Sequence, residues 1–584
     1  MTAAEVHTER IDDMPLLIRQ QEKMGIPAVI DDVIEAHGNR QGLSHGWLAA
    51  IWLSYILSEA DHRMNRVESW AEGRLASLQA LVPSEVMVKD FTDDRLADSL
   101  RALSDDIAWE EIERQLSRRL VRVYDLSSAT VRLDSTTVSV HHDPRQSPLF
   151  GFGHSKDHRP DLPQLKVMLG TLDPLGMPLA TLVVPGETAD DGLYLPVVED
   201  NRATLGAGCL YVGDNKMSAL ATRGALQDAG DYYLTALPRT GNVPQLVEEL
   251  VAAVWEGEQP LTPVYKRQPY NEHADRQLQA LAYETERLQE DQVAGQTVTW
   301  QERLLVVYSP SLAQRARRGL AQRLRNAEEA LLALTPPRGR GRKQWQDLEA
   351  LERKVAAILK RHRVQGLLAV DYQLEVERWP VRAYGDQPAR TEERYRYLVR
   401  VRRKREAISH AARLLGWRLY VTNAPVARLP LGDAVRTYRS APTIERDFRR
   451  LKGHPLGLPP LYVQREDHAQ GLVRLLTLGL RVLTLVEHVV RDALADAGEA
   501  LAGLYPANPK RETARPTTER LLEAFKELNL TVVQLPEQAI CHLTPLTDLQ
   551  HRILTLLQLP VSLYDDLAAA VQQKLIRAQN LSEP

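Results

Sequence analysis

Cysteine is nearly absent from this sequence. Only Cys209 and Cys541 occur among its 584 residues, too few for a disulfide framework or a four-thiolate zinc site. These absences exclude the disulfide-stapled secreted classes. We therefore expect a cytoplasmic protein that works in a reducing environment.

A secretory signal and a clear membrane span are also missing. The N-terminal MTAAEVHTERIDDMP carries acidic residues and has no apolar core segment, so we expect no signal peptide. The most apolar long stretch, residues 471–490, is interrupted by Arg474, Arg481, Glu487 and His488. Three of these recur every seven residues, which indicates an amphipathic helix with one polar stripe and argues against a membrane partner.

The chain has little net charge, only -4, from 73 Lys and Arg against 77 Asp and Glu. A nucleic-acid surface must therefore come from local clusters of basic residues, and the overall balance neither proposes nor excludes DNA. With 44% hydrophobic and 26% charged residues, the composition is that of an ordinary globular protein. Its length is several times the usual roughly 100 to 200 residues of a domain, so we expect three or four structural units.

The pattern changes from helical to strand-like near residue 125. Before it, the apolar run Trp47–Leu57 follows Ser44, a suitable N-cap, and alternating segments are few. After it, strands are predicted in VRVYDLSSATVRLDSTTVSV, QLKVMLGTLD, LATLVVP and CLYVGD, with a helix over 192–204 before the last. Asp134 lies within the first strand, and Asp214 ends the fourth.

A helix and a strand follow Met217, and a long mixed region then runs to Gly416. Within it, apolar residues recur at helical spacing in 320–331 and again in 348–358, on either side of TPPRGRGRKQ. This pattern predicts two helices joined by a basic turn. Strand-like segments flank the pair, and the chain returns to a strand in GWRLYVTNAP and to a helix near Pro442. Residues 507–520 are the best candidate linker.

Two aspartates on strands and one glutamate on a distant helix are the arrangement that two-metal phosphoryl transfer needs. Hard divalent cations prefer oxygen ligands, and two of them about 3.5 to 4 Å apart can clamp both the attacking and the leaving oxygen. Asp134 in VRLDSTTVS and Asp214 in LYVGDNKMS have apolar neighbours that fix the backbone and leave each carboxylate at an edge. In an open α/β sheet, ligands gather at such an edge.

The third carboxylate is Glu445, in the helical segment PTIERDFRRLKG. Ile444, Phe448 and Leu451 are spaced to bury one face of this helix, and Glu445, Arg449 and Lys452 share the adjoining face. A metal ligand beside phosphate-binding side chains is the surface expected of a DNA-cutting groove. The chain has 77 acidic residues, and most such residues are simply solvated, so each of the three acids taken singly is more simply interpreted that way. The prediction of an active site therefore depends on their combination.

With these three acids and their surrounding motifs, the sequence resembles bacterial insertion-sequence transposases of the DDE class. It is most similar to the group with a Tyr, Arg, Glu, Lys motif. That motif is Tyr, two residues, Arg, three residues, Glu, six residues, Lys, and in YRSAPTIERDFRRLK it places Tyr438, Glu445 and Lys452 in register. Ala441 stands where the family has Arg, and Arg439 is the candidate substitute. The resemblance extends over GHSKDHRPDLPQLKVML and GWRLYVTNAP, from about Ser44 to Leu485.

The resemblance implies an α/β fold: a ribonuclease-H-like mixed sheet core, interrupted by an α+β insertion, with helical N-terminal and C-terminal regions. The units expected are a helical N-terminal domain with possible end-binding (1–125), the first part of the core (126–237), the insertion (238–415), the second part of the core (416–490) and a C-terminal region (491–584).

By the same resemblance, Asp134, Asp214 and Glu445 hold two Mg²⁺ or Mn²⁺ ions per active site. Metal-activated water attacks the phosphodiester at each transposon end, and the freed 3′-hydroxyl then attacks target DNA. Tyr438, Arg439, Arg449, Lys452, Lys156 and Arg159 are expected to contact DNA. The partners implied are double-stranded DNA, as terminal inverted repeats and target, and a second copy in a homodimer located at the bacterial nucleoid. A DDE-fold nuclease without strand transfer and an inactive DNA-binding descendant remain alternatives.

Several other groups have two interpretations. His141, His142 and Asp143 suggest a metal site, but neighbouring strand residues point to opposite faces. The segments SKDHRPD and PRGRGRK either contact DNA or form solvated turns. Trp300 and Trp379 could stack a flipped base, but ordinary sheet packing is the better interpretation for both.

Overall fold

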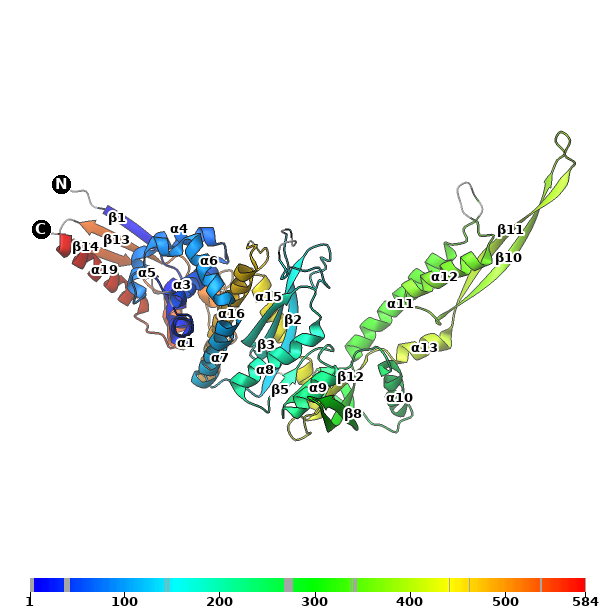
Figure 1. The fold of residues 1–584 in the computed structure, drawn as a ribbon, viewed down its shortest axis with the longest axis horizontal. Helices are drawn as coiled ribbons and strands as arrows, with labels where there is room; N and C mark the ends of the chain where they lie inside the picture. The colour runs from blue at the N-terminus through cyan, green and yellow to red at the C-terminus, as the bar shows by residue number, and fades with distance from the viewer. Residues whose placement is uncertain are drawn as a thin grey trace.

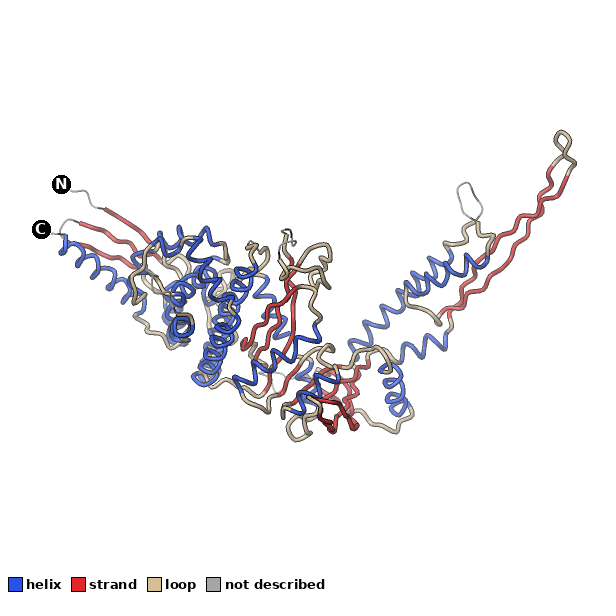
Figure 2. Tube along the Cα trace, viewed as in Figure 1, coloured by secondary structure: helices blue, strands red, loops and turns tan. Residues whose placement is uncertain are grey.

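The computed structural model describes residues 5–35, 42–141, 143, 147–266, 277–337, 339, 344–440, 442–461, 463–535 and 538–582. The molecule is elongated, with both termini at one end and a long arm projecting at the other (Figure 1). A nine-stranded sheet lies between them, and Figure 2 shows its strands among the surrounding helices.

Five strands form the first half of this sheet, in the order β4-β3-β2-β5-β6. They and their helices are β2 (Thr130–Ser139), β3 (Gln164–Leu172), β4 (Met177–Pro185), α8 (Tyr194–Leu205), β5 (Leu210–Val212), α9 (Leu220–Asp228) and β6 (Tyr232–Ala236). The first three strands are antiparallel, whereas β5 and β6 run parallel to β2, with α9 as the crossover between them. This mixed sheet confirms the expected α/β, ribonuclease-H-like core.

The second half of the sheet continues from β6 in the order β12-β9-β8-β7. These strands are β7 (Thr262–Tyr265), β8 (Leu278–Val293), β9 (Gln296–Tyr308) and β12 (Trp417–Thr422). The helix α10 (Val243–Trp255) precedes them, and α14 (Leu431–Tyr438) covers a second buried cluster on one side of this half. Most of these strands come from the segment expected to be an insertion, so its first part extends the core sheet instead of standing apart from it.

The projecting arm consists of α11 (Pro310–Leu332), α12 (Leu348–Arg361), β10 (Leu368–Val381) and β11 (Arg390–Arg403), and α13 (Arg405–Arg413) leads back from it. Leu320, Leu324, Ala327 and Leu331 of α11 pack against Leu351 and Val355 of α12 in a third buried cluster. This confirms the predicted pair of helices. Of the basic turn between them, all four cations lie outside the described residues.

The N-terminal region is mainly helical, as expected, and shares one buried cluster with the sheet and the C-terminal region, from Ile11 to Val571. Its helices are α1 (Met14–Met24), α2 (Ile26–Val33), α3 (His45–Glu59), α4 (Val67–Glu72), α5 (Leu75–Leu81), α6 (Asp93–Ser104) and α7 (Asp106–Val123). Ser44 caps α3 as predicted, because its hydroxyl accepts a hydrogen bond from the Trp47 N–H at 3.4 Å.

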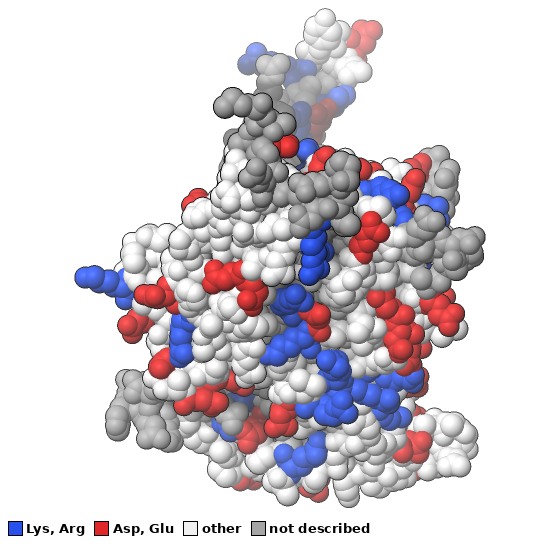
Figure 3. Space-filling view, turned by 90° about the vertical axis from the view of Figure 1, so that its left-hand side faces the viewer, with Lys and Arg blue, Asp and Glu red and all other residues white. Residues whose placement is uncertain are grey.

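The chain ends meet in a small sheet that sequence patterns did not reveal. The strand β1 (Glu5–Arg10) pairs with β13 (Asn529–Leu535), which pairs with β14 (Gln538–Leu543). The C-terminal region is therefore not purely helical, although α17 (Thr518–Glu523), α18 (Asp548–Leu556) and α19 (Leu563–Ser582) belong to it. Basic and acidic side chains are interspersed on this end of the molecule (Figure 3).

The long helix α16 (Glu466–Ala497) packs against α3, α6, β4 and the short helix α15 (Pro442–Lys452). By length and composition it could cross a membrane, but 94% of its most apolar window is buried inside the protein. The predicted polar stripe is largely buried as well: Arg481 pairs with Glu113 at 2.8 Å, and Glu487 with Arg446 at 2.9 Å. The stripe therefore faces carboxylates and guanidinium groups of neighbouring helices instead of solvent.

Candidate active site

Asp134 lies on β2, and Asp214 lies two residues beyond the end of the neighbouring strand β5, close enough for its charge to act on Asp134. The parallel register pairs Arg132 of β2 with Val212 of β5, so each aspartate stands two residues beyond this pair. Adjacent strands are about 4.7 to 4.9 Å apart, and equal offsets on parallel strands point side chains to the same side. The structure thus brings together the two acids that the sequence places 80 residues apart.

The Asp134 carboxylate is partly exposed, at 31% of its side chain, and accepts hydrogen bonds from Ser135 N–H at 2.8 Å and from Lys156 Nζ at 3.5 Å. Burial raises the pKa of the Asp134 carboxyl, and the charge of Asp214 raises it further, although Lys156 and the Ser135 N–H act in the opposite direction. The two aspartates therefore repel each other, and this part of the site favours a cation.

Asp214 begins an exposed turn that follows β5. Its Oδ1 accepts hydrogen bonds from the Tyr194 hydroxyl at 2.6 Å and from the Lys216 N–H at 2.8 Å. Burial and the charge of Asp214 raise the pKa of Tyr194, so this hydroxyl remains a proton donor. The backbone is also fixed, because Thr235 Oγ1 donates to the Asp214 carbonyl at 2.5 Å.

Glu445 lies in the first turn of α15 and is exposed. Ile444, Phe448 and Leu451 are buried, as the helical spacing predicts. Glu445 makes no hydrogen bond or ion pair with any residue that the structure describes, and it does not pair with Arg449. Among the described residues, no group of three His, Cys, Asp or Glu side chains is arranged to hold a metal ion. The structure therefore assembles the aspartate pair but does not place Glu445 in one cluster with it.

Two consecutive residues of the connection between β2 and β3 link the sheet to the end of α15. Lys156 reaches Asp134, and Asp157 forms an ion pair with Lys452 at 2.6 Å. The Lys156 N–H also donates to Thr137 Oγ1 at 3.0 Å, which fixes this segment against β2. Lys156 is thus part of the candidate site and not a side chain of a solvated turn, whereas Lys452 is held by a carboxylate.

Tyr438 and Arg439, at the end of α14, line a cavity of about 480 Å³ beside Asn215. Burial, the adjacent Tyr420 and the charge of Asp214 raise the pKa of Tyr438, which places this phenol near the aspartate pair. Arg439 donates to the Gln279 carbonyl at 2.7 Å and so attaches α14 to β8. Three further guanidinium groups, those of Arg239, Arg315 and Arg418, line the same cavity.

The remaining candidates have mixed outcomes. Arg159 is exposed and pairs with Asp161 at 2.7 Å. Ala441 and His142 lie outside the described residues. Trp300 is buried and donates to the Tyr233 hydroxyl at 2.8 Å, which is ordinary sheet packing. For Trp379 the packing expectation is wrong: it is 52% exposed, because the ribbon β10–β11 extends into solvent.

Sequence reasoning missed Tyr194 and a third acid, Asp190. Asp190 Oδ1 accepts hydrogen bonds from Lys166 Nζ at 2.7 Å and from Ser135 Oγ at 3.2 Å. Burial alone would raise the pKa of Asp190, but the Lys166 hydrogen bond and the charge of Lys156 outweigh it and lower the pKa. No spacing in GETADDGLYL marks these residues, since they reach the site only through the packing of the segment after β4.

The donor set fits a divalent cation. Asp134 and Asp214 offer carboxylate oxygens, the ligands that Mg²⁺ and Mn²⁺ prefer. Burial, and to a smaller extent the charge of Asp214, raise the pKa of Asp134, and the Lys156 ammonium supplies the opposing positive charge in this structure. Glu445 is an exposed carboxylate that no described residue neutralises.

Comparison with known proteins identifies the family. The family described as "Transposase DDE domain" matches residues 128–480. No curated protein matches. Among solved structures, the chain is similar to the piggyBac transposase in its synaptic complex with hairpin DNA, determined by cryo-electron microscopy, with 8% identity and a TM-score of 0.34 over 99% of this chain and 85% of that one. Because the family match covers more than half of the chain and includes all three candidate acids, this protein belongs to the DDE transposases.

Proposed function

We propose that Asp134, Asp214 and Glu445 are the catalytic carboxylates of this DNA transposase. The observation that carries the proposal is the equal offset of the two aspartates beyond the Arg132–Val212 pair on parallel strands. It gives two neighbouring acids where β5 ends beside β2, and phosphoryl transfer on DNA needs such charge at fixed positions. Glu445 is the third candidate because it is exposed, has no ion-pair partner among the described residues, and lies on the helix α15, whose far end reaches the connection between β2 and β3 through Lys452.

Two Mg²⁺ or Mn²⁺ ions per site are the proposed cofactors, with both aspartates as ligands and Glu445 completing the shell of one ion. When bound, such ions make a hydroxyl nucleophilic at neutral pH and neutralise charge that develops on the phosphodiester. Since the three acids do not form one cluster, we propose that the aspartate pair holds an ion without DNA and that Glu445 joins the site only when DNA binds.

The lysines beside the acids suggest how the protein changes on binding. Lys156 and Lys452 are each held by a carboxylate, Asp134 and Asp157. If cations replace Lys156 at Asp134, both ammonium groups become available for phosphate groups of the DNA strand. Tyr438 and Arg439 would then line the path of that strand beside Asp214, with Arg449 and Arg159 at its edges.

The substrate proposed is double-stranded DNA with the inverted repeats of a bacterial insertion sequence, cut at both ends and joined to target DNA by a homodimer at the nucleoid. The register of Tyr438, Glu445 and Lys452 supports the group with the Tyr, Arg, Glu, Lys motif. Inverted repeats in the DNA that flanks the gene would supply the substrate for all assays below.

The test is metal-dependent nicking of an end fragment. Asp134→Asn, Asp214→Asn and Glu445→Gln should each abolish nicking while DNA binding remains. Asp433, a half-buried acid on α14 paired with Arg436, provides the matched control, and Asp433→Asn should retain full activity. Full activity of any of the three variants would remove that residue from the site. Nicking without products joined to target DNA would favour a nuclease, and DNA binding without nicking by the unaltered protein would favour an inactive descendant.

A further inference from the structure

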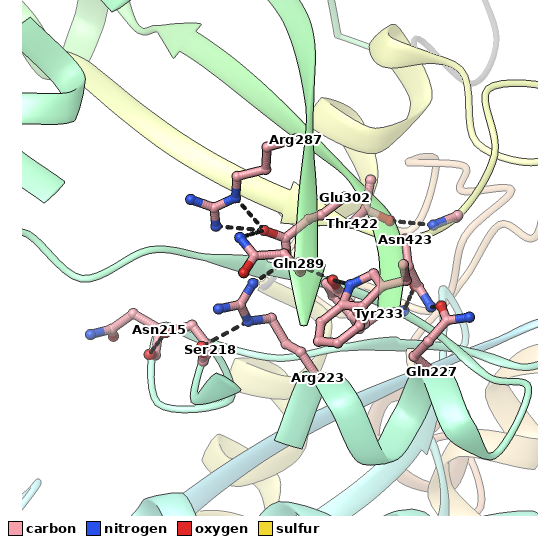
Figure 4. Close-up of polar contacts among 12 residues, drawn as sticks. Asn215, Ser218, Arg223, Gln227, Tyr233, Arg287, Gln289, Glu302, Thr422 and Asn423 are labelled. Carbon is pink, nitrogen blue, oxygen red and sulfur yellow. Dashed lines mark hydrogen bonds and ion pairs between the residues drawn. The ribbon is translucent and has the colours of Figure 1, made fainter. Parts of the chain in front are cut away.

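The most heavily hydrogen-bonded buried acid in this part of the sheet is Glu302, in the middle of β9. Its side chain is fully buried, with 0% exposure. Figure 4 shows two guanidinium groups, an amide and a phenol converging on its carboxylate. Hydrogen bonds to a buried carboxylate are short and directional, so this group fixes the elements that meet at it.

The donors to Glu302 come from three other elements. From β8, Arg287 donates to Oε2 at 2.7 Å and Gln289 at 3.2 Å. From β6, the Tyr233 hydroxyl donates to Oε1 at 2.5 Å. From α9, Arg223 forms an ion pair with Oε1, and its side chain is only 7% exposed. One carboxylate on the extended half of the sheet thus holds a strand and a helix of the catalytic half.

Arg223 connects Glu302 to the turn that begins with Asp214. Its Nε donates to the Ser218 carbonyl at 2.9 Å, and Ser218 Oγ donates to the Asn215 carbonyl at 2.7 Å. The Met217 N–H donates to the Asp214 carbonyl at 3.1 Å, which closes the turn. A guanidinium group can hold both Glu302 and Ser218 because its donors form a rigid fork.

Building on the proposed role of Asp214, we propose that Glu302 is a positioning residue for DNA cleavage. Through Arg223 it fixes the turn 214–218 and with it the Asp214 carboxylate beside Asp134. Asp214 itself is exposed, and its turn follows a strand of only three residues, so the sheet alone constrains it weakly. Glu302 is fully buried, and among the described residues no hydrogen bond or ion pair joins it directly to Asp134, Asp214 or Glu445, so its effect is on ion binding.

The test measures binding of Mn²⁺ alone, without DNA, from the electron paramagnetic resonance of the free ion. Glu302→Gln keeps the shape of the side chain but removes the charge that orients Arg223. Supporting residues around metal ligands typically contribute about 10- to 100-fold to affinity, so Mn²⁺ binding should weaken by about 10-fold or more. Nicking at saturating DNA should fall, the KM for DNA should stay the same, and high Mn²⁺ should restore part of the rate.

A second variant keeps the test decisive if Glu302→Gln folds poorly. Arg223→Met leaves Glu302 paired with Arg287 but cuts the connection to Ser218, and it should give the same loss of Mn²⁺ affinity. Since both variants break one path, the double variant should be no worse than either single one.

The matched control is Glu284→Gln. Glu284 pairs with Arg303 between the same two strands, yet no hydrogen bond or ion pair of the described residues leads from it to the turn. It should keep wild-type Mn²⁺ affinity and cleavage.

Two results would separate the possible failures. If Asp214→Asn abolishes Mn²⁺ binding while Glu302→Gln leaves it unchanged, the positioning role is wrong and the site stands. If Asp214→Asn itself binds Mn²⁺ normally, the site is wrong, and the positioning role fails with it. Equal loss in Glu284→Gln and Glu302→Gln would show a general effect of disturbing β8 and β9 and would also overturn the proposal.

Discussion

A buried ion pair between α7 and α16 predicts that removing its acid and removing its base have different effects on the pH dependence of stability. Arg481 is 0% exposed and Glu113 7%, at 2.8 Å from each other. Arg481 also donates to the Leu179 carbonyl at 2.9 Å, and Glu113 accepts from the Thr181 N–H at 2.9 Å. The pair therefore joins the N-terminal helices, β4 of the core and the central helix. Removing either partner leaves a buried charge, but only the carboxyl group can neutralise itself by taking up a proton.

The size of each loss follows from this difference. Glu113→Gln leaves the Arg481 charge unpaired and should lower the free energy of unfolding by about 3 to 5 kcal/mol above pH 7, where Glu113 is ionised in the unaltered protein. Burial raises the pKa of Glu113 to about 7, against the lowering effect of Arg481. In Arg481→Met that lowering effect is lost, so the pKa of Glu113 rises further.

The pH dependence has a definite sign. An acid whose pKa is higher in the folded than in the unfolded protein binds its proton more tightly when folded, so stability falls as pH rises from the unfolded value to the folded one. In the unaltered protein this fall ends near pH 7. In Arg481→Met it should continue above pH 7, at up to about 1.4 kcal/mol per pH unit.

Urea unfolding of the three proteins between about pH 6 and pH 9 measures these slopes. Glu113→Gln should run parallel to the unaltered protein above pH 7, and Arg481→Met should diverge from it. The double variant Glu113→Gln/Arg481→Met should recover most of the loss, because no buried charge remains. Parallel curves for all three proteins would refute the reasoning, as would a steeper fall in Glu113→Gln.

Three further predictions concern the site and its surroundings. Lys452→Ala should slow single-turnover nicking on the order of 100-fold, since a strand misplaced by about 1 Å costs that much, whereas Arg449→Ala should cost only a few-fold; equal rates would mean that the motif register is wrong. Lys156→Met should move the acid limb of the cleavage pH profile upward, because Lys156 holds down the pKa of Asp134. Burial and nearby acids raise the pKa of Asp200 to about 6, so Asp200→Asn should raise the melting temperature more at pH 8 than at pH 5.

Local patterns predicted the elements that carry the site. Alternating apolar residues located β2, β3, β4 and β5, and the spacing of Ile444, Phe448 and Leu451 identified the buried face of α15. Such signals depend on neighbours within about one or two turns or strand repeats, so they are readable in a single sequence. The resemblance then added which carboxylates belong together.

What the sequence could not provide is pairing between distant segments. Asp157 meets Lys452 across 295 residues, and β1 pairs with β13 across more than 500. No periodicity encodes such partners, because they depend on how complete elements pack. The strand β8 was also missed, although its sixteen residues pair with the next strand along the chain, β9.

The shared core also changes how DNA-end recognition by the N-terminal helices can be tested. The helix α6 packs on α16, and α7 packs on β4, inside the cluster that includes the catalytic sheet. Removing residues 1–125 would expose this apolar surface, and the loss of sequence preference would then report unfolding. Substitutions of exposed basic residues on these helices keep the core intact and test the idea directly.

Each candidate acid lies on a strand, turn or helix whose position is fixed by an arginine–carboxylate pair. On β2, Arg132 pairs with Asp173 at 2.9 Å, two residues before Asp134. The turn of Asp214 depends on Glu302 through Arg223. The helix α15 is fixed by Glu487, which pairs with Arg446, next to Glu445, and with Arg450.

Buried ion pairs add little net stability compared with apolar packing. Their advantage here is direction, since a catalytic group must be held within about 0.5 Å of its working position. The three acids are far apart in sequence and belong to different layers, so directional contacts keep them in register while DNA enters and leaves.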